Sequence, residues 1–238
     1  MSEVMRINKY IANAGICSRR DADKLVEQGR VTINGKLATQ GSQVGSCDTV
    51  CVNGKCIRAK DDKVVLAFYK PVGITCTERD KFAEKTILEY VKYPVRVTYA
   101  GRLDKDSEGL ILLTNDGNLI QALMKGSNYH EKEYVVKVDK EISPHFLENM
   151  AQGVYLKELD RTTRPCRIEQ VGKFTFKIIL TQGLNRQIRR MTKELGYNVI
   201  SLKRIRIEKI TIDGLKIGQY RELTDREKEN LYETVGLK

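Results

Sequence analysis

The most constraining feature of this chain is a run of four apolar residues set between a charged loop and a glycine turn. Residues 110–113 read Leu-Ile-Leu-Leu, and such a short, wholly apolar run predicts a strand buried on both faces. The preceding loop, residues 101–109, carries Arg102 and Asp104 and has a glycine at each end, where backbone or a ligand can approach closely. The sequence therefore places one carboxylate at the edge of a buried sheet. Asp104 is either a catalytic residue or part of an ordinary charged loop before a strand.

The first part of the chain predicts a small module of two helices and two hairpins. Apolar residues recur with helical spacing in residues 7–14, and Ser18 is placed to cap a second helix that ends at Gly29. Hairpin turns are expected at Asn34-Gly35 and at Asn53-Gly54, because both central residues of a type I′ turn need a positive φ.

After a short charged stretch at residues 60–63, which we take as a linker, strand and helix patterns alternate. Proline and glycine mark several of the predicted boundaries. The expected elements are a strand at 64–69, a turn at 70–73, a short helix at 86–90, a helix at 116–126, a strand from 134, a helix at 144–152, a strand at 174–180, a helix at 186–195, short strands between 199 and 223, and a helix at 224–232.

The charge of the chain favours a polyanionic partner. Its 238 residues carry a formal net charge of +11, and the sequence pI is about 9.3. Residues 181–206 contain seven Lys or Arg side chains against one acid, Glu194. Contacts to phosphates explain this clustering better than solubility does, although scattered lysines on a soluble basic protein are the simpler alternative.

Six cysteines are present, of which Cys47, Cys51 and Cys56 lie close together in the sequence. Their spacing lacks the paired pattern of zinc ligands and neither histidine is near, so we expect no metal site and reduced thiols. No run reaches the ~20 apolar residues of a membrane span, and the N-terminus has no apolar signal core. We therefore expect a cytoplasmic protein that is neither secreted nor membrane-bound.

Three strings of residues are similar to the motifs of one enzyme family. Gly-Arg-Leu-Asp at 101–104, continued by Ser-Glu-Gly-Leu at 107–110 and Leu-Thr-Asn-Asp-Gly at 113–117, resembles the active-site motif of RNA pseudouridine synthases. Lys-Pro-Val-Gly at 70–73 resembles the first motif of that family, and Gly-Leu-Asn-Arg-Gln-Ile-Arg-Arg-Met at 183–191 resembles its third. The match is to the bacterial branch that modifies ribosomal RNA and carries an N-terminal S4 domain.

The first module carries a resemblance of its own. Residues 17–23 and 29–35 are similar to the S4 RNA-binding domain, which grips structured RNA through its second helix and hairpin. Together the resemblances imply an α+β fold with an S4-like domain at 1–62. A catalytic domain at 63–238 would follow, built on a mixed, mostly antiparallel sheet with flanking helices.

The resemblance also implies roles for individual residues. Asp104 would act at the junction of sugar and base, Tyr134 would stack on the target base, and Arg189 would pair with Asp104. Arg102 would fill the space that the extruded base leaves. A tyrosine of the core is the alternative for Tyr134, and a solvated face is the alternative for the basic residues of the first module. Further RNA contacts are expected from Arg19, Arg20, Lys24, Arg30, Lys70, Asn185, Arg186 and Arg190.

The expected activity is isomerisation of a uridine to pseudouridine in ribosomal RNA, with 23S rRNA as the first candidate and transfer RNA as a second. The reaction consumes nothing, so neither a metal nor another cofactor is expected, and we expect a monomer. The sequence leaves two alternatives open. One is a non-catalytic RNA-binding or ribosome-assembly factor, and the other is the same chemistry on small-subunit rRNA or transfer RNA.

Overall fold

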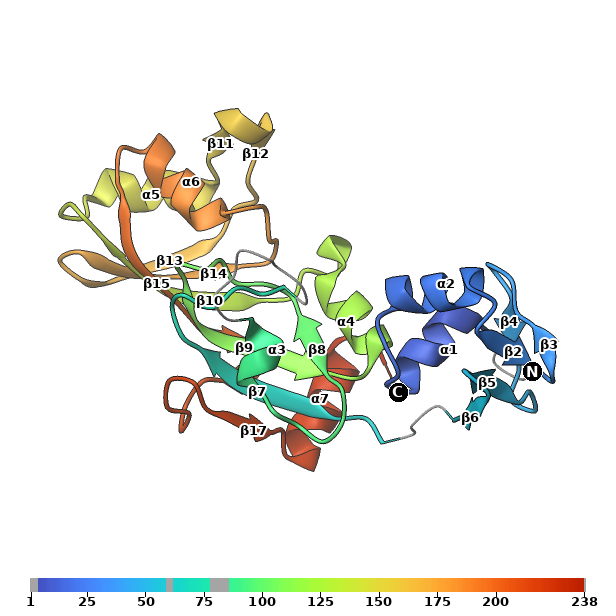
Figure 1. Cartoon of the computed structure of the whole chain (residues 1–238). Coiled ribbons are helices and arrows are strands. Elements are labelled where there is room, and N and C mark those ends of the chain that lie inside the picture. Colours follow the sequence, from blue (N-terminus) through green and yellow to red (C-terminus); the bar gives the residue numbers. More distant parts are fainter. Residues whose placement is uncertain (1–3, 59–61, 78–85, 238) are drawn as a thin grey trace. The chain divides into compact units, whose positions relative to one another are not determined.

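The structure is a computed structural model that describes residues 4–58, 62–77 and 86–237 (Figure 1). The chain divides into two compact units. The first comprises Met1–Val64 with the short segments Tyr93–Val97 and Asn115–Gly117, and the second comprises the rest. The predicted linker at 60–63 lies partly outside the described residues, and a domain boundary after residue 62 stays a prediction.

The first unit contains two helices and a small sheet, as the sequence predicts. Ser18 Oγ accepts a hydrogen bond from the Asp21 backbone N–H at 3.2 Å, which caps the second helix. Asn34 and Asn53 both have a φ of 51° and begin the two hairpin turns. The elements are β1 (Met5–Arg6), α1 (Ile7–Asn13), α2 (Arg19–Glu27), β2 (Val31–Ile33), β3 (Lys36–Leu37), β4 (Gln43–Val44), β5 (Val50–Val52) and β6 (Lys55–Ile57), with four strands in the order β3-β2-β5-β6 and β1 paired with β4.

The second unit is built on one mixed sheet of nine strands. Its main path runs β13-β14-β10-β15-β9-β7-β17, and β16 and β8 pair with β15 and β9. The pairings are antiparallel except that of β9 with β15, so the predicted mixed, mostly antiparallel sheet is confirmed. The strands are β7 (Val65–Lys70), β8 (Thr98–Ala100), β9 (Glu108–Thr114), β10 (Lys132–Val138), β13 (Arg167–Gly172), β14 (Thr175–Leu180), β15 (Val199–Ile207), β16 (Ile210–Thr211) and β17 (Tyr220–Glu222), with β11 (Tyr155–Leu156) and β12 (Arg161–Thr162) forming a separate pair.

Among the described residues, two separate clusters of buried apolar side chains join the sheet to its helices. Leu119 and Leu231, from α4 and α7, pack with β7 and β9, whereas Phe146 and Met191, from α5 and α6, pack with β10 and β14. The apolar run of β9 is fully buried at residues 110–113, as predicted. The helices are α3 (Ile87–Tyr90), α4 (Gly117–Met124), α5 (Pro144–Gln152), α6 (Gln187–Glu194) and α7 (Asp225–Thr234).

The parallel contact between β9 and β15 depends on a glycine. Gly109 lies opposite Arg204 with a φ of +115°, and a Cβ on it would lie 2.2 Å from the Arg204 carbonyl oxygen. Arg204 is buried, and its Nε donates to the Leu110 carbonyl at 2.6 Å. This close approach fixes the strand that directly follows the loop bearing Asp104.

Two further findings concern the cysteines and the helices. Cys51 and Cys56 lie opposite each other in the β5–β6 hairpin and form a disulfide, so the prediction of reduced thiols is wrong for this pair. Cys47, Cys76 and Cys166 are free thiols. Among the described residues, every helix is too short or too polar to cross a lipid bilayer.

Candidate active site

A cleft of about 390 Å³ in the second unit gathers six of the eight candidate site residues that lie in this unit. Its walls come from the loop before β9, from Tyr134 on β10, and from residues 182–189 leading into α6. Leu180, Ile188 and Leu202 supply an apolar side. The predicted site residues that line this cleft are Arg102, Asp104, Tyr134, Asn185, Arg186 and Arg189.

Lys70 holds the loop that carries Asp104 through hydrogen bonds to its backbone. The Nζ of this lysine donates to the carbonyl oxygens of Asp104 at 3.1 Å, Ser107 at 2.7 Å and Pro71 at 3.0 Å. Lys70 is 0% exposed, and burial is the main cause that lowers its pKa. The prediction that Lys70 contacts RNA is therefore wrong, because the side chain is used inside the protein to hold the loop.

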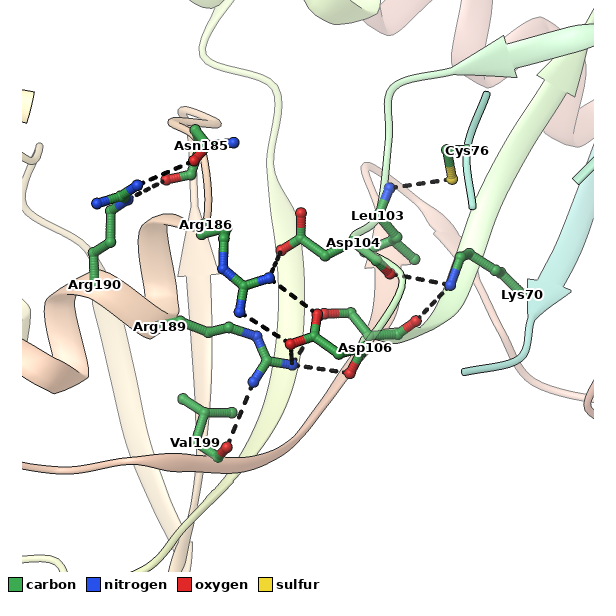
Figure 2. Close-up of polar contacts among 11 residues, drawn as sticks. Lys70, Cys76, Leu103, Asp104, Asp106, Asn185, Arg186, Arg189, Arg190 and Val199 are labelled. Carbon is green, nitrogen blue, oxygen red and sulfur yellow. Dashed lines mark hydrogen bonds and ion pairs between the residues drawn. The ribbon is translucent and has the colours of Figure 1, made fainter. Parts of the chain in front are cut away.

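Arg186 lies between two carboxylates of that loop (Figure 2). Its Nη1 is 3.6 Å from Asp104 Oδ2, and its two Nη atoms bond both oxygens of Asp106 at 3.2 and 3.0 Å. These bonds from Arg186 are the main cause that lowers the pKa of Asp106. Arg186 has a left-handed φ of 50° at the start of α6, which costs roughly 1 kcal/mol and is offset by the bidentate pair.

Arg189 does not make the predicted pair with Asp104. Its Nη2 donates to the Asp106 backbone carbonyl at 2.9 Å and to Ser107 Oγ at 3.3 Å, and it lies 3.3 Å from Asp106 Oδ2. Arg186 instead makes the contact with Asp104 (Figure 2). Arg189 thus holds the loop at Asp106 and Ser107 rather than at the Asp104 carboxylate.

The basic cluster at 181–206 is only partly available to phosphates. Arg190 pairs with Glu158 and donates to Asn185. Asn185 lines the cleft, whereas Arg190 does not. Arg204 is buried in the sheet. Arg206 pairs with glutamates of β10 and of the residue before it, and Lys193 lies 3.5 Å from Glu158. Several of these cations therefore support the fold, which corrects the view that the cluster exists for RNA alone.

The remaining predicted residues are accessible. Arg102 is exposed and lines the cleft, and Tyr134 is half-buried against the core of α5 and α6 while also facing the cleft. In the first unit, Arg19, Arg20 and Lys24 are exposed on α2. Arg30 is also exposed, and its Nε donates to Asn53 Oδ1 at 2.6 Å in the turn between β5 and β6.

Two residues of the site were missed by sequence reasoning. Asp106 is the carboxylate that both Arg186 and Arg189 contact, and its position two residues after Asp104 in the same charged loop was the available signal. Cys76 lines the cleft, and its Sγ accepts a hydrogen bond from the Leu103 backbone N–H at 3.5 Å. Burial raises the pKa of this thiol. No motif signalled Cys76, because its role depends on which loop it packs against.

Comparison with known protein families identifies the family to which this chain belongs. Residues 64–194 match the family described as RNA pseudouridylate synthase. The chain belongs to this family. Residues 5–50 match the S4 domain, so the pseudouridine synthase carries the N-terminal module that its sequence predicts.

Individual relatives agree with this assignment. The dual-specificity RNA pseudouridine synthase RluF of Salmonella typhi is 47% identical over 232 residues, which cover 97% of this chain and 79% of that protein. The ribosomal large subunit pseudouridine synthase B of Bacillus subtilis is 36% identical, with 95% of each chain covered. A solved structure titled "Crystal structure of pseudouridylate synthase" is 28% identical with a TM-score of 0.71, covering 95% of this chain and 99% of that one.

Within the family, residues 130–134 and 182–185 look similar to those of the large-subunit enzyme designated pseudouridine synthase F. The identity to RluF over nearly the whole chain confirms this resemblance. The pseudouridine synthase is thus an enzyme of the RluF type, with an S4 domain before a catalytic domain.

Proposed function

We propose that this enzyme converts a uridine of 23S ribosomal RNA to pseudouridine, acting as a monomer in the cytoplasm. The observation that carries the proposal is the position of Asp104. Its carboxylate lines a cleft that also has apolar side chains and whose other charged side chains include Arg102, Arg186 and Arg189. A protein that only binds RNA gains nothing from a carboxylate there, because it repels phosphates.

We propose the following course for the reaction in the cleft that Asp104 and Tyr134 line. The target base leaves its stack and enters between Asp104 and Tyr134. The N-glycosidic bond breaks, the base turns while it is held, and a bond forms between the sugar carbon and a base carbon. This base carbon then loses its proton, and the ring nitrogen released from the sugar takes up a proton. Asp104 either attacks the sugar carbon or removes a sugar proton. Tyr134 stacks on the base and assists removal of the proton from carbon.

Arg186 is the guanidinium that orients Asp104 in this proposal, and Arg189 holds the loop through Asp106. This assignment rests on the 3.6 Å approach of Arg186 to Asp104 and on the contacts of Arg189 with the loop backbone. Arg102, exposed at the cleft, takes the place of the extruded base in the RNA stack. Outside the cleft, the RNA contacts four basic residues of the first unit, Arg19, Arg20, Lys24 and Arg30.

The names of the relatives support ribosomal RNA as the substrate, since one is a ribosomal large subunit enzyme. The RluF relatives are called dual-specificity RNA pseudouridine synthases, and this favours a second RNA substrate, for which we propose transfer RNA.

The test is incubation of the purified protein with separate deproteinised transcripts of large-subunit rRNA, small-subunit rRNA and transfer RNAs, followed by pseudouridine mapping. We expect conversion at a discrete uridine of the large-subunit transcript. Conversion confined to small-subunit rRNA or to transfer RNA would overturn the 23S assignment, and no conversion of any RNA would overturn the proposed reaction.

A further inference from the structure

A second hollow adjoins the catalytic cleft. It encloses about 220 Å³ and shares four lining residues with the cleft, Met124 and residues 182–184, so the two share a wall. None of the described side chains that line it is acidic, whereas five carry or can carry positive charge. These five are Lys125, His130, Lys132, Arg161 and Arg164.

Two polar groups that line this hollow lack partners among the described residues. His130 is 6% exposed, and its Nδ1 lies 2.9 Å from Glu208 Oε1, but its Nε2 is buried without a hydrogen bond. The Nε2 amide of Gln182 is likewise buried without a partner. Buried polar atoms almost always have a hydrogen-bond partner in the protein or in ordered water, so we take these two groups as the binding groups of the hollow.

The histidine has a defined hydrogen-bonding role. Glu208 Oε1 also accepts from the Glu131 backbone N–H at 2.8 Å, which fixes the carboxylate beside the ring. A carboxylate oxygen accepts, so Nδ1 is the donor of this pair, and in the tautomer that carries its hydrogen on Nδ1 the Nε2 atom is an acceptor. The Gln182 Nε2 group is a donor. The hollow thus offers one acceptor and one donor, a pair that a ribose 2′-hydroxyl satisfies because it both donates and accepts.

The cations around this pair suit a phosphate. Arg164 is held in the wall, since its Nη1 donates to the Gly126 and Thr181 carbonyls at 3.0 and 3.2 Å and its guanidinium lies 4.0 Å from the Tyr129 ring centroid. Lys132 Nζ donates to the His130 carbonyl at 3.2 Å. Arg161 is exposed and can reach a backbone phosphate without leaving a buried partner unpaired.

We propose that this hollow is a subsite for the ribose and phosphate of a nucleotide next to the target uridine, with its 2′-hydroxyl on His130 Nε2 and Gln182 and its phosphate on the cations. The inference rests on the proposed function, because RNA must occupy the adjoining cleft. Extrusion of the target base bends the backbone, and a fixed neighbouring sugar would hold that bend.

The test measures binding of a full-length large-subunit rRNA transcript to the full chain at several salt concentrations. His130→Asn places an amide near the Nδ1 position and deletes the Nε2 position, whereas His130→Gln does the reverse. We expect His130→Asn to weaken binding roughly three- to tenfold, as for one lost hydrogen bond, and His130→Gln to weaken it less. Arg161→Ala, at an exposed position that cannot disturb folding, should reduce the salt slope by about 1.

The matched control is Lys173→Ala, an exposed lysine that lines neither hollow and should leave the slope unchanged. The subsite is refuted if Arg161→Ala keeps the wild-type slope, or if His130→Gln weakens binding more than His130→Asn, which would mean that only the Glu208 contact matters. Pseudouridine mapping of the same mixtures separates the two proposals. Conversion without these binding effects removes the subsite alone, whereas the binding effects without conversion remove the reaction alone.

Discussion

Lys70 gives the sharpest test of how the fold positions the catalytic loop. Lys70→Met keeps the length of the side chain and removes three charge-assisted hydrogen bonds to carbonyls, including those of Asp104 and Ser107. Such bonds contribute roughly 1.5–3 kcal/mol each, or roughly 5–9 kcal/mol together, and the cost of burying an ammonium, several kcal/mol, offsets part of this. We expect a net loss of about 2–4 kcal/mol in the free energy of unfolding.

The same substitution should slow catalysis more than it weakens binding. Without Lys70 the loop relaxes, and a displacement of about 1 Å at a reacting group lowers rates by roughly a hundredfold. The assays are urea unfolding followed by circular dichroism, single-turnover pseudouridine formation, and RNA binding. Lys105→Met, at an exposed lysine of the same loop, is the control and should leave stability unchanged. Unchanged stability of Lys70→Met together with a lower salt slope of RNA binding would refute the reasoning, because Lys70 would then contact RNA.

Three other perturbations test separate parts of the account. Arg19→Ala combined with Arg20→Ala should weaken RNA binding and reduce its salt slope by about 2, since both side chains are exposed on α2. Gly109→Ala should cost about 2–5 kcal/mol in urea unfolding, because its Cβ would lie 2.2 Å from the Arg204 carbonyl and its φ is positive. Burial lowers the pKa of Lys132 to about 8, so the unfolded chain holds its proton to higher pH than the native state does. The stability of wild type relative to Lys132→Met should therefore rise between pH 8 and 10.

For each of these three predictions, one experimental result would contradict the expected outcome. A salt slope that stays at the wild-type value in the arginine double variant removes the first unit from RNA recognition. Gly117→Ala, where an added Cβ meets nothing within 4 Å, is the control for Gly109→Ala, and equal midpoints of the two variants would contradict the close-approach argument. A difference between wild type and Lys132→Met that is constant from pH 8 to 10 would show that Lys132 titrates normally.

Local signals in the sequence predicted local structure well. The type I′ turns at Asn34 and Asn53 and the Ser18 cap depend on neighbours a few residues away, and the wholly apolar composition of β9 signals its burial. The structure has all of them where expected. The Cys51–Cys56 disulfide could also have been found. A hairpin that turns at Asn53-Gly54 places Cys51 opposite Cys56.

The positions of residues whose role depends on pairing between strands far apart in the sequence could not be predicted from local signals. Lys70 is the last residue of β7, and it is buried because β7 pairs with β9, which brings the loop of Asp104 against it. Arg204 belongs to a basic stretch in the sequence but is buried by the parallel contact of β15 with β9. Arg186, and not Arg189, contacts Asp104, and its φ of 50° is one that a non-glycine residue rarely adopts, so no signal in the sequence indicated this conformation.

The central claim is that the carboxylate of Asp104 carries out the chemistry in a cleft that otherwise serves to bind RNA. The most direct measurement is the single-turnover rate of pseudouridine formation by Asp104→Asn, with RNA affinity measured in parallel. Asparagine keeps the size of the side chain and removes only the negative charge beside Arg186. The account predicts that conversion is abolished while RNA binding is retained or strengthened. Conversion within about tenfold of the wild-type rate would contradict it, since no catalytic carboxylate loses so little, about 1.4 kcal/mol of barrier, when it is neutralised.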